Sequence, residues 1–444
     1  MSDQDGARPD EQRLAGPTSV PLLHKFLYGL AYVPVGLSTI MVMTWIGMRY
    51  YPPETATAAS VALATEGAVA AALILGRVVD AIADPLLGYW SDRLRTRWGR
   101  RKPFILVGGP LLAVTFVLIW TPPVPALSAI NAVYLGITAS AFFFAFTVVV
   151  CPYLAMLPEI TPDPAERVSL GAWQGGFNVL GTVGGMALTG YLVHSYGYRT
   201  MGLVYAPVIL FCAWAPLLVP TPVAAKEPSD LPLRRAVAST FSNPWFPPYV
   251  ISQLLFWLAL SIVLMAGLQL PVARARVDEA VAGLPLAAAL LVAGLLFPVM
   301  RTLAERVSKR RLLMGAMVWL GLMMVPLIFA GLLPLPLTAF QQMFLVMALA
   351  GPSVAALFAL PNPMVGDIVD HDEELTGQRR EAIYFGVQGL LVKAGTGVGA
   401  GIAVLLLGLF GNDATRQGGF IACPLVAMVL AWVAAAVLTR YRGD

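Results

Sequence analysis

Long apolar runs separated by short polar connections follow one another through this 444-residue chain. A helix needs about 20 apolar residues to cross a bilayer. Twelve runs meet that requirement, at about 25–49, 64–90, 103–121, 128–157, 169–193, 200–219, 245–270, 279–300, 312–331, 338–366, 381–410 and 418–439. The pattern predicts an all-α polytopic membrane protein with twelve transmembrane helices.

Two polar stretches divide the chain. Residues 1–22 show no apolar period and predict a disordered tail, and residues 220–244 form the longest later interruption and predict a linker. The basic motif after the second run, ending at Lys102, recurs after the eighth, ending at Arg311. This weak repeat predicts two six-helix bundles, residues 23–219 and 245–440, related by an axis along the membrane normal.

The composition and the basic residues predict a location and an orientation. Hydrophobic residues make up 58% of the chain and charged residues 12%, which is outside the range of soluble domains. Lys and Arg crowd the second and eighth connections, whereas the first, third and ninth are nearly free of them. Cytoplasmic loops carry such an excess, so both termini are expected in the cytoplasm. The net charge of +4 belongs to these loops and does not indicate nucleic-acid binding.

Three charges interrupt the second apolar run. Arg77, Asp80 and Asp84 stand at i, i+3 and i+7, so they share one face of a helix. A charge at bilayer depth costs about 2.5 to 3.5 kcal/mol on insertion scales, so this face must meet protein, water or an ion. It is the candidate functional site, although a salt-bridge stripe that only locks helices together is the alternative.

A counterpart for these charges lies in the second half of the chain. At 1.5 Å per residue, Asp80 is about 18 Å from the surface marked by Asp92, and Lys393 is about 20 Å from the one marked by Arg380. Lys393 is the ionisable residue deep in the second half. We hypothesise that the aspartate pair faces Lys393 across a central cavity, where binding of H⁺ or Na⁺ changes the attraction between the halves.

Polar and aromatic side chains in the apolar runs are candidates for binding a solute, or for helix packing alone. Gln388 ranks first because it shares a helix face with Lys393. The other candidates are Gln174, Asn178, Tyr153 and Trp257.

The second and tenth connections are candidates for gating. Asp92, Arg93, Arg100 and Arg101 mix an acid with bases at the membrane surface, where ion pairs could form and break as the halves move. They could equally be membrane anchors. The tenth connection, with Asp367 and Arg380 at its ends, reads as an acidic loop that pairs with the basic loops. It lacks the ligand spacing of a calcium loop, and no enzyme motif accompanies the charges.

The chain resembles the glycoside-pentoside-hexuronide:cation symporters of the major facilitator superfamily, the family that includes the melibiose permease. Arg77 to Asp84 resembles the family's cation motif in the second span, and Asp92 to Phe104 resembles the Asp-Arg and Trp-Gly-Arg-Arg-Lys-Pro signature that follows it. Gln388 to Lys393 resembles the family's motif in the eleventh span, which contains an essential lysine. The resemblance implies a major facilitator fold and symport of a glycoside-like solute by alternating access. It also implies that Asp80 and Asp84 bind H⁺ or Na⁺.

The solute side departs from the family pattern. Gly36 and Val150 stand where the melibiose permease carries aspartates, the one at Gly36 being sugar-binding, and Leu154 stands where it carries a stacking tryptophan. A carrier of an amphiphile such as a lysophospholipid is therefore the alternative, and a non-transporting membrane sensor or enzyme is a weaker one. We expect no cofactor beyond the coupling ion, and a monomer in a bacterial inner membrane.

Overall fold

The computed structural model describes residues 19–53, 56, 61–161, 163–221, 240–377, 381–413 and 415–443. Most of the predicted tail and most of the predicted linker fall outside these ranges. Ten helical stretches in the described ranges are long and apolar enough to cross a membrane. Together with the charge-bearing second helix and the second part of one long stretch, they correspond to the twelve predicted spans. The prediction of an all-α membrane protein is confirmed.

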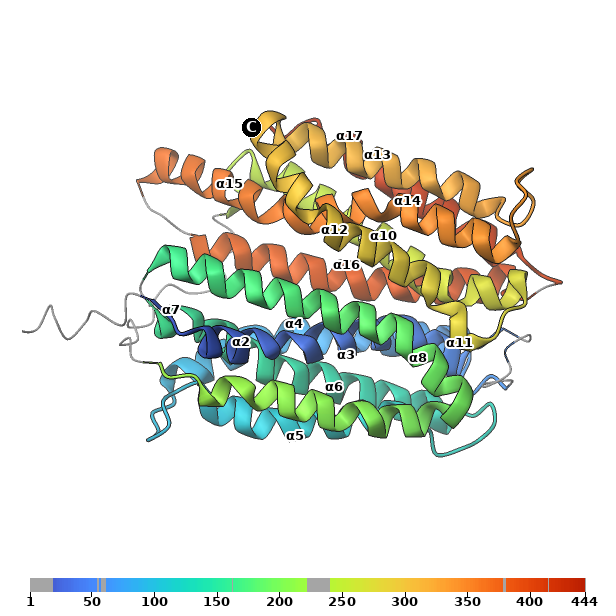
Figure 1. Cartoon of the computed structure of the whole chain (residues 1–444), viewed down its shortest axis with the longest axis horizontal. Helices are drawn as coiled ribbons and strands as arrows, with labels where there is room; N and C mark the ends of the chain where they lie inside the picture. Colours follow the sequence, from blue (N-terminus) through green and yellow to red (C-terminus); the bar gives the residue numbers. More distant parts are fainter. Residues whose placement is uncertain are drawn as a thin grey trace, which may run out of the picture.

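The helices of the first half pack together in the lower part of Figure 1. We call them the N-terminal bundle. They are α2 (Leu22–Leu30), α3 (Tyr32–Tyr50), α4 (Glu66–Arg93), α5 (Lys102–Ile119), α6 (Ala129–Ala155), α7 (Leu157–Ile160), α8 (Pro164–Trp214) and the 3₁₀ helix η1 (Ala215–Leu218).

The helices of the second half lie above them in Figure 1 and form the C-terminal bundle. They are α10 (Phe246–Ala275), α11 (Glu279–Ala282), α12 (Leu284–Arg306), α13 (Lys309–Ile328), α14 (Ala339–Ala359), α15 (Pro361–Thr376), α16 (Glu381–Phe410) and α17 (Gly418–Leu438). The acidic tenth connection is thus helical as far as Thr376, where Gly377 ends α15 in the left-handed region. The prediction of a loop there is wrong.

Helix α8 contains two predicted spans. Gly197 interrupts it with φ 78° and ψ 167°, a backbone conformation that favours glycine. Two helices, the fifth and sixth spans, join at this residue and run in opposite directions in Figure 1. This explains why the structure shows one continuous stretch where the sequence predicts two.

Helix pairing repeats between the two bundles. In the N-terminal bundle α3 packs on α8, α4 on α6, and α5 on both α6 and α8. In the C-terminal bundle α10 packs on α16, α12 on α14, and α13 on both α14 and α17. Corresponding helices therefore make corresponding pairs, as expected for an internal repeat.

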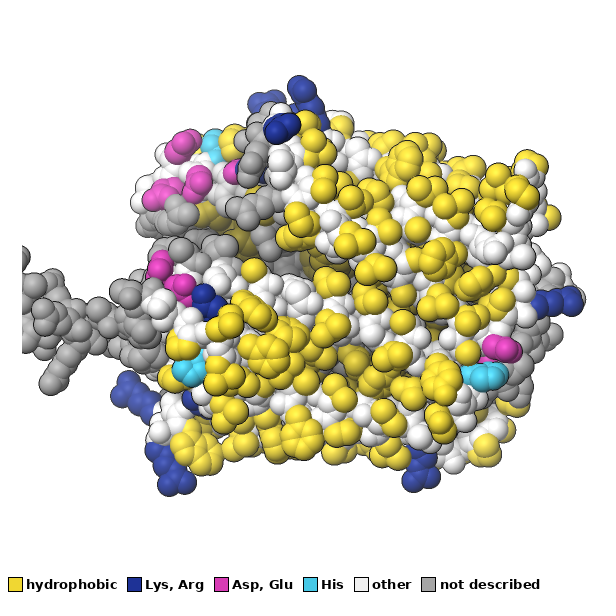
Figure 2. All heavy atoms as spheres, viewed as in Figure 1, with side chains coloured by type: hydrophobic (Ala, Val, Ile, Leu, Met, Phe, Trp, Pro, Cys, Tyr) yellow, Lys and Arg dark blue, Asp and Glu magenta, His cyan; other side chains and the backbone are white. Residues whose placement is uncertain are grey.

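The two ends of the molecule differ in how closely the bundles approach. We call the end at the left of Figure 1, where the connection after Arg93 lies, the terminal end, and the opposite one the distal end. At the distal end α8 packs on α11 and α3 on α10, and α4 packs on α16. Toward the terminal end, a Cβ atom added at Gly386 or Gly389 of α16 would meet nothing within 4 Å. Figure 2 shows a hollow between the bundles on one face.

Candidate functional site

The charged face of α4 points into the contact between the two bundles. Arg77 and Asp80 are buried, with side chains 6% and 0% exposed, and Arg77 Nη1 lies 3.2 Å from Asp80 Oδ2. Asp84, one turn nearer the terminal end, is 36% exposed. Water can therefore reach the cluster at Asp84, whereas Asp80 is shielded from water.

Lys393 joins this face from the C-terminal bundle. Its ammonium nitrogen lies 2.9 Å from Asp80 Oδ1 and 2.8 and 2.7 Å from the two carboxylate oxygens of Asp84. Three oxygens match the three donors of an ammonium group. The structure therefore brings together the residues that the depth count placed at matching depth, although their role in binding a cation stays a prediction.

Helix α6 completes the cluster with residues that the sequence analysis missed. Thr147 donates its hydroxyl hydrogen to Asp80 Oδ1, and Cys151 Sγ lies 3.9 Å from the backbone oxygen of Asp84. The ring of Phe143 lies under the guanidinium of Arg77, 4.3 Å from ring centre to carbon. Phe143, Thr147 and Cys151 recur every four residues, which marks one face of a helix. That spacing was the available signal, but nothing in it says which helix the face meets.

The charges in the cluster balance. Two carboxylates face one guanidinium and one ammonium, so the cluster is neutral when all four groups are ionised. In a poorly polarisable interior, a buried charge is tolerated only when it is paired and hydrogen-bonded. Adding one cation or removing one would unbalance the cluster and change the attraction between the two bundles.

Close packing of α16 on α4 holds Arg77 in place. A Cβ atom at Gly397 would overlap Cγ of Arg77, so only glycine lets the helices approach this closely. We expect Gly397→Ala to push the bundles apart. An overpacked contact costs about 1 to 3 kcal/mol, which corresponds to a thermal unfolding midpoint lower by about 2 to 6 °C. Fluorescence-monitored unfolding in detergent would measure it.

Gly389→Ala is the matched control because that position on the same helix opens onto free space. It should leave the midpoint unchanged or raise it slightly, since alanine favours a helix. Equal midpoints for the two variants would contradict a tight contact at Gly397.

The predicted solute-binding residues do not gather at one place. Gln388 is 8% exposed, and its side-chain oxygen has no hydrogen-bond partner among the described residues. Trp257 packs edge-on against the exposed Phe358, with ring centres 5.6 Å apart. Both belong to the C-terminal bundle. An unpaired buried amide oxygen is costly unless water or a ligand satisfies it, so Gln388 remains the best of these candidates.

Tyr153 and Gln174 use their polar groups within the N-terminal bundle. Gln174 Nε2 donates to the hydroxyls of Tyr153, at 2.8 Å, and Tyr28, at 3.1 Å, and the Tyr153 hydroxyl donates to the backbone oxygen of Tyr28. All three side chains are buried. Contact of Tyr153 or Gln174 with a solute stays a prediction, but it would compete with these bonds.

Asn178 lies against Gly36, the position where the resembled family carries a sugar-binding aspartate. A Cβ atom at Gly36 would lie 2.6 Å from Asn178 Oδ1 and 2.6 Å from Thr182 Oγ1. The close approach of α3 and α8 therefore leaves no room for a side chain at Gly36. Recognition of a sugar by a carboxylate at this position is excluded by packing.

The predicted gating residues form ion pairs within each bundle. At the terminal end Arg100 Nε lies 2.8 Å and Arg101 Nε 3.3 Å from Glu159 Oε1, and Lys309 Nζ lies 2.5 Å from Asp367 Oδ2. The two clusters occupy equivalent places in the repeat, after the second and fourth spans and after the eighth and tenth. These ion pairs hold each bundle together, and a role in gating stays a prediction.

The remaining gating candidates are less defined. Arg93 stacks over the ring of Tyr89, 3.5 Å from its centre. The side chain of Asp92 and the whole of Arg380 lie outside the described residues.

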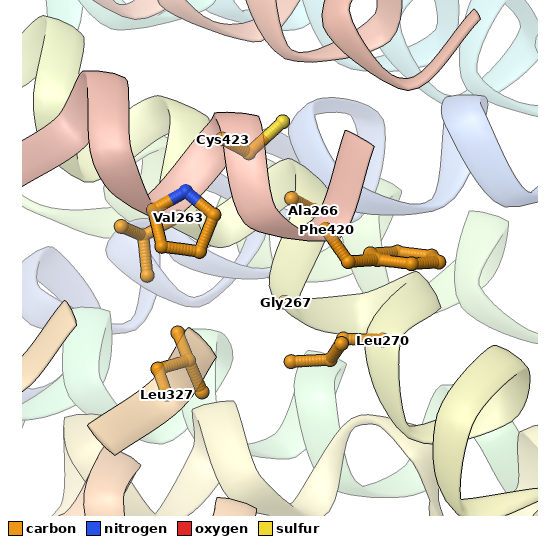
Figure 3. A pocket seen from close by; sticks show the side chains of 8 residues that line it. Val263, Ala266, Gly267, Leu270, Leu327, Phe420 and Cys423 are labelled. Carbon is orange, nitrogen blue, oxygen red and sulfur yellow. The ribbon is translucent and has the colours of Figure 1, made fainter. Parts of the chain in front are cut away.

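Among the described residues, an apolar cavity and an open groove lie outside the charged cluster. Figure 3 shows the apolar cavity of about 10 Å³ between α10, α13 and α17, lined by residues such as Val263, Leu327 and Phe420. It is too small for a solute. The open groove of about 470 Å³ runs along α8, lined by Ser169, Ala172, Trp173, Gly176, Phe177 and Leu180. Its lining is mostly apolar and aromatic.

Comparisons with known proteins place the chain in a family. The family model described as MFS/sugar transport protein matches residues 27–439. An isoprimeverose transporter of Lactiplantibacillus pentosus is 26% identical over 93% of this chain and 86% of its own. The sodium-dependent lysophosphatidylcholine symporter 1 of Xenopus tropicalis is 36% identical, over 27% of this chain and 23% of its own.

A solved structure has the same fold. A mutant of the nucleoside transporter NupG superposes with a TM-score of 0.68 at 14% identity, covering 94% of this chain and 99% of the other. At this identity the likeness concerns the fold alone.

Proposed function

The chain belongs to the MFS/sugar transport protein family, and from that membership we propose that it moves a glycoside-like solute into the cell together with H⁺ or Na⁺. The family match confirms the resemblance identified from the sequence and the class of function, a cation-coupled symporter in the membrane. The identity of the solute and of the cation, the direction of transport and the residues that act are the proposal.

The observation that carries the proposal is the bond between the bundles at the charged cluster. Lys393 of one bundle occupies the place between Asp80 and Asp84 of the other that an incoming cation would need. A metal cation that binds these carboxylates must therefore displace the ammonium group, and a proton that binds one of them removes the negative charge that holds the ammonium group. Loading the site loosens the link between the bundles, and unloading it restores the link, which couples cation binding to alternating access.

The basic residues orient this mechanism in the membrane. We assign the terminal end to the cytoplasm because the basic connection after Arg93 lies there. The bundles meet at the distal end, so this conformation faces inward. Asp84, the exposed carboxylate, would then release its cation to the cytoplasm. The protein acts as a monomer in a bacterial inner membrane and needs no cofactor besides the coupling ion.

H⁺ is the simpler coupling ion for this cluster. At this cluster α4 and α6 offer a cation the oxygens of Thr147 and of the two carboxylates, whereas Val150 has no side-chain oxygen to offer. A proton needs one carboxylate oxygen, but a metal cation needs several oxygens around it. Na⁺ remains the second possibility and is tested below.

An amphiphile is the alternative solute, favoured by one observation. The groove on α8 has a volume of about 470 Å³ and an apolar and aromatic lining that includes Trp173, Phe177 and Leu180, which suits an apolar chain better than a sugar. The packed Gly36 also removes a sugar-binding carboxylate. The similarity to a lysophosphatidylcholine symporter over part of the chain agrees with this alternative.

Uptake into proteoliposomes separates these possibilities. A panel of glycosides and lysophospholipids is presented with an imposed H⁺ gradient, an imposed Na⁺ gradient or neither. We expect a glycoside to accumulate above its outside concentration with the H⁺ gradient and not without a gradient. Accumulation of a lysophospholipid supports the alternative, and no gradient-dependent uptake of any compound would favour a non-transporting role.

A further inference from the structure

A buried carboxylate of the C-terminal bundle faces a histidine of the N-terminal bundle at the distal end. Glu279, the first residue of α11, has a fully buried side chain, and its Oε2 lies 4.0 Å from Nδ1 of His194 on α8. His194 is 42% exposed. The imidazole is therefore open to water at the distal surface, whereas the carboxylate is covered.

The backbones of the two bundles touch around this pair. A Cβ atom at Gly190 of α8 would overlap the backbone oxygen of Glu279, and one at Gly283 would overlap the backbone oxygen of Met186. Each bundle thus contributes one glycine that lets the other bundle's backbone come into contact. The distal end cannot open unless this contact separates.

Other polar groups of the N-terminal bundle surround the carboxylate. Tyr198 of α8 interacts electrostatically with both Glu279 and Arg49 of α3, and the Arg49 guanidinium carbon lies 5.1 Å from the centre of the Tyr198 ring. The further charged residues of the packed segments, which are exposed, are Arg199, Arg276 and Asp278. Arg49 does not change charge near neutral pH, so His194 is the group there that external protons can switch.

We propose that the contact between α8 and α11 is the external gate of the transporter, and that His194 and Glu279 form a proton-operated latch on it. A protonated imidazole attracts the carboxylate and holds the gate shut, whereas a neutral imidazole loses most of that attraction. Acid outside the cell therefore favours the closed external gate. This inference rests on the proposed orientation, in which the distal end faces outward.

The test measures gate opening without transport. Met265 of α10 has no exposed surface and its sulfur packs on Gly47 of the other bundle, so a thiol there is reachable from outside only when the distal end opens. Met265→Cys is built in a background where Cys151, Cys212 and Cys423 are alanine. Right-side-out vesicles are labelled with a membrane-impermeant maleimide at an external pH of about 5.5 and about 8.

Histidine variants separate the latch from general effects of pH. His24→Asn changes a histidine of α2 far from this contact and serves as the matched control. At low external pH we expect His194→Asn to label about three- to fivefold faster than His24→Asn, the range for a partly exposed ion pair. At high external pH the two should label at similar rates.

Two further variants keep the proposal open to contradiction. The arginine of His194→Arg carries a permanent charge, so this variant should label slowly at both pH values. At low external pH its rate should equal that of His24→Asn, and at high external pH its rate should be lower than that of His24→Asn. Glu279→Gln should label faster than His24→Asn at low pH. The proposal is wrong if His194→Asn and His24→Asn label alike at low pH, or if Glu279→Gln has no effect. The assay needs no uptake, so failure of the proposed symport would not decide it.

Discussion

Replacing Asp84 by asparagine should reduce gradient-driven uptake at least about a hundredfold while leaving folded protein in the membrane. An asparagine side chain cannot take up a proton. It offers a metal cation or the Lys393 ammonium one uncharged oxygen in place of the two charged oxygens of Asp84, which lie 2.7 and 2.8 Å from the ammonium nitrogen. Asp84 is 36% exposed, so water can solvate the altered site and the thermal midpoint should fall little. Uptake of radiolabelled solute by proteoliposomes would measure the loss.

Asp80→Asn should lose uptake equally but also lower the thermal midpoint. Asp80 is fully buried and binds Arg77, Thr147 and Lys393, so its loss leaves uncompensated buried charge. Asp367→Asn is the matched control, because it breaks an ion pair with Lys309 outside the cluster. Full uptake by Asp84→Asn would contradict the proposed coupling, and equal loss in Asp367→Asn would show a general effect of removing an ion pair.

The transmembrane helices and the matching depth of Asp80 and Lys393 can be predicted from the sequence. Both depend on local properties of the chain. Apolar length sets a transmembrane helix, and a fixed rise per residue sets depth, so Asp80 and Lys393 could be placed at matching depth before any contact was known. Asp84 followed because it shares the face of Asp80. None of these inferences required knowing how a helix is turned about its own axis.

Side-chain contacts between helices could not be predicted, because they depend on how each helix is rotated about its axis and on how closely it packs against its neighbour. Thr147 looked like one of many hydroxyls in the apolar runs, and only the packing of α6 on α4 brings it to Asp80. Gln174 shares its helix with exposed neighbours, but its rotation points the amide at Tyr28 and Tyr153. The acidic composition of the tenth connection predicts a loop, although charged residues are compatible with a helix that ends at the membrane surface.

Lys393→Met should abolish gradient-driven uptake and at the same time strengthen cation binding. Removal of the ammonium leaves Asp80 and Asp84 facing Arg77 alone, so the cluster carries one uncompensated negative charge. A cation can then occupy the vacated place without competition. When the cation concentration is above the dissociation constant, a tenfold gain in affinity adds about 1.4 kcal/mol to the free energy of unfolding.

Thermal unfolding in detergent measures this gain, with NaCl compared with choline chloride at equal ionic strength, and with mildly acidic buffer compared with neutral buffer. Lys309→Met removes a paired lysine outside the cluster and should respond to Na⁺ and acid as the parent does. Adding Asp84→Asn to Lys393→Met restores neutrality and should remove the extra response. If Lys393→Met responds to neither Na⁺ nor acid more than the parent, the lysine does not compete with the cation, and the link between the bundles would be structural rather than coupled to transport.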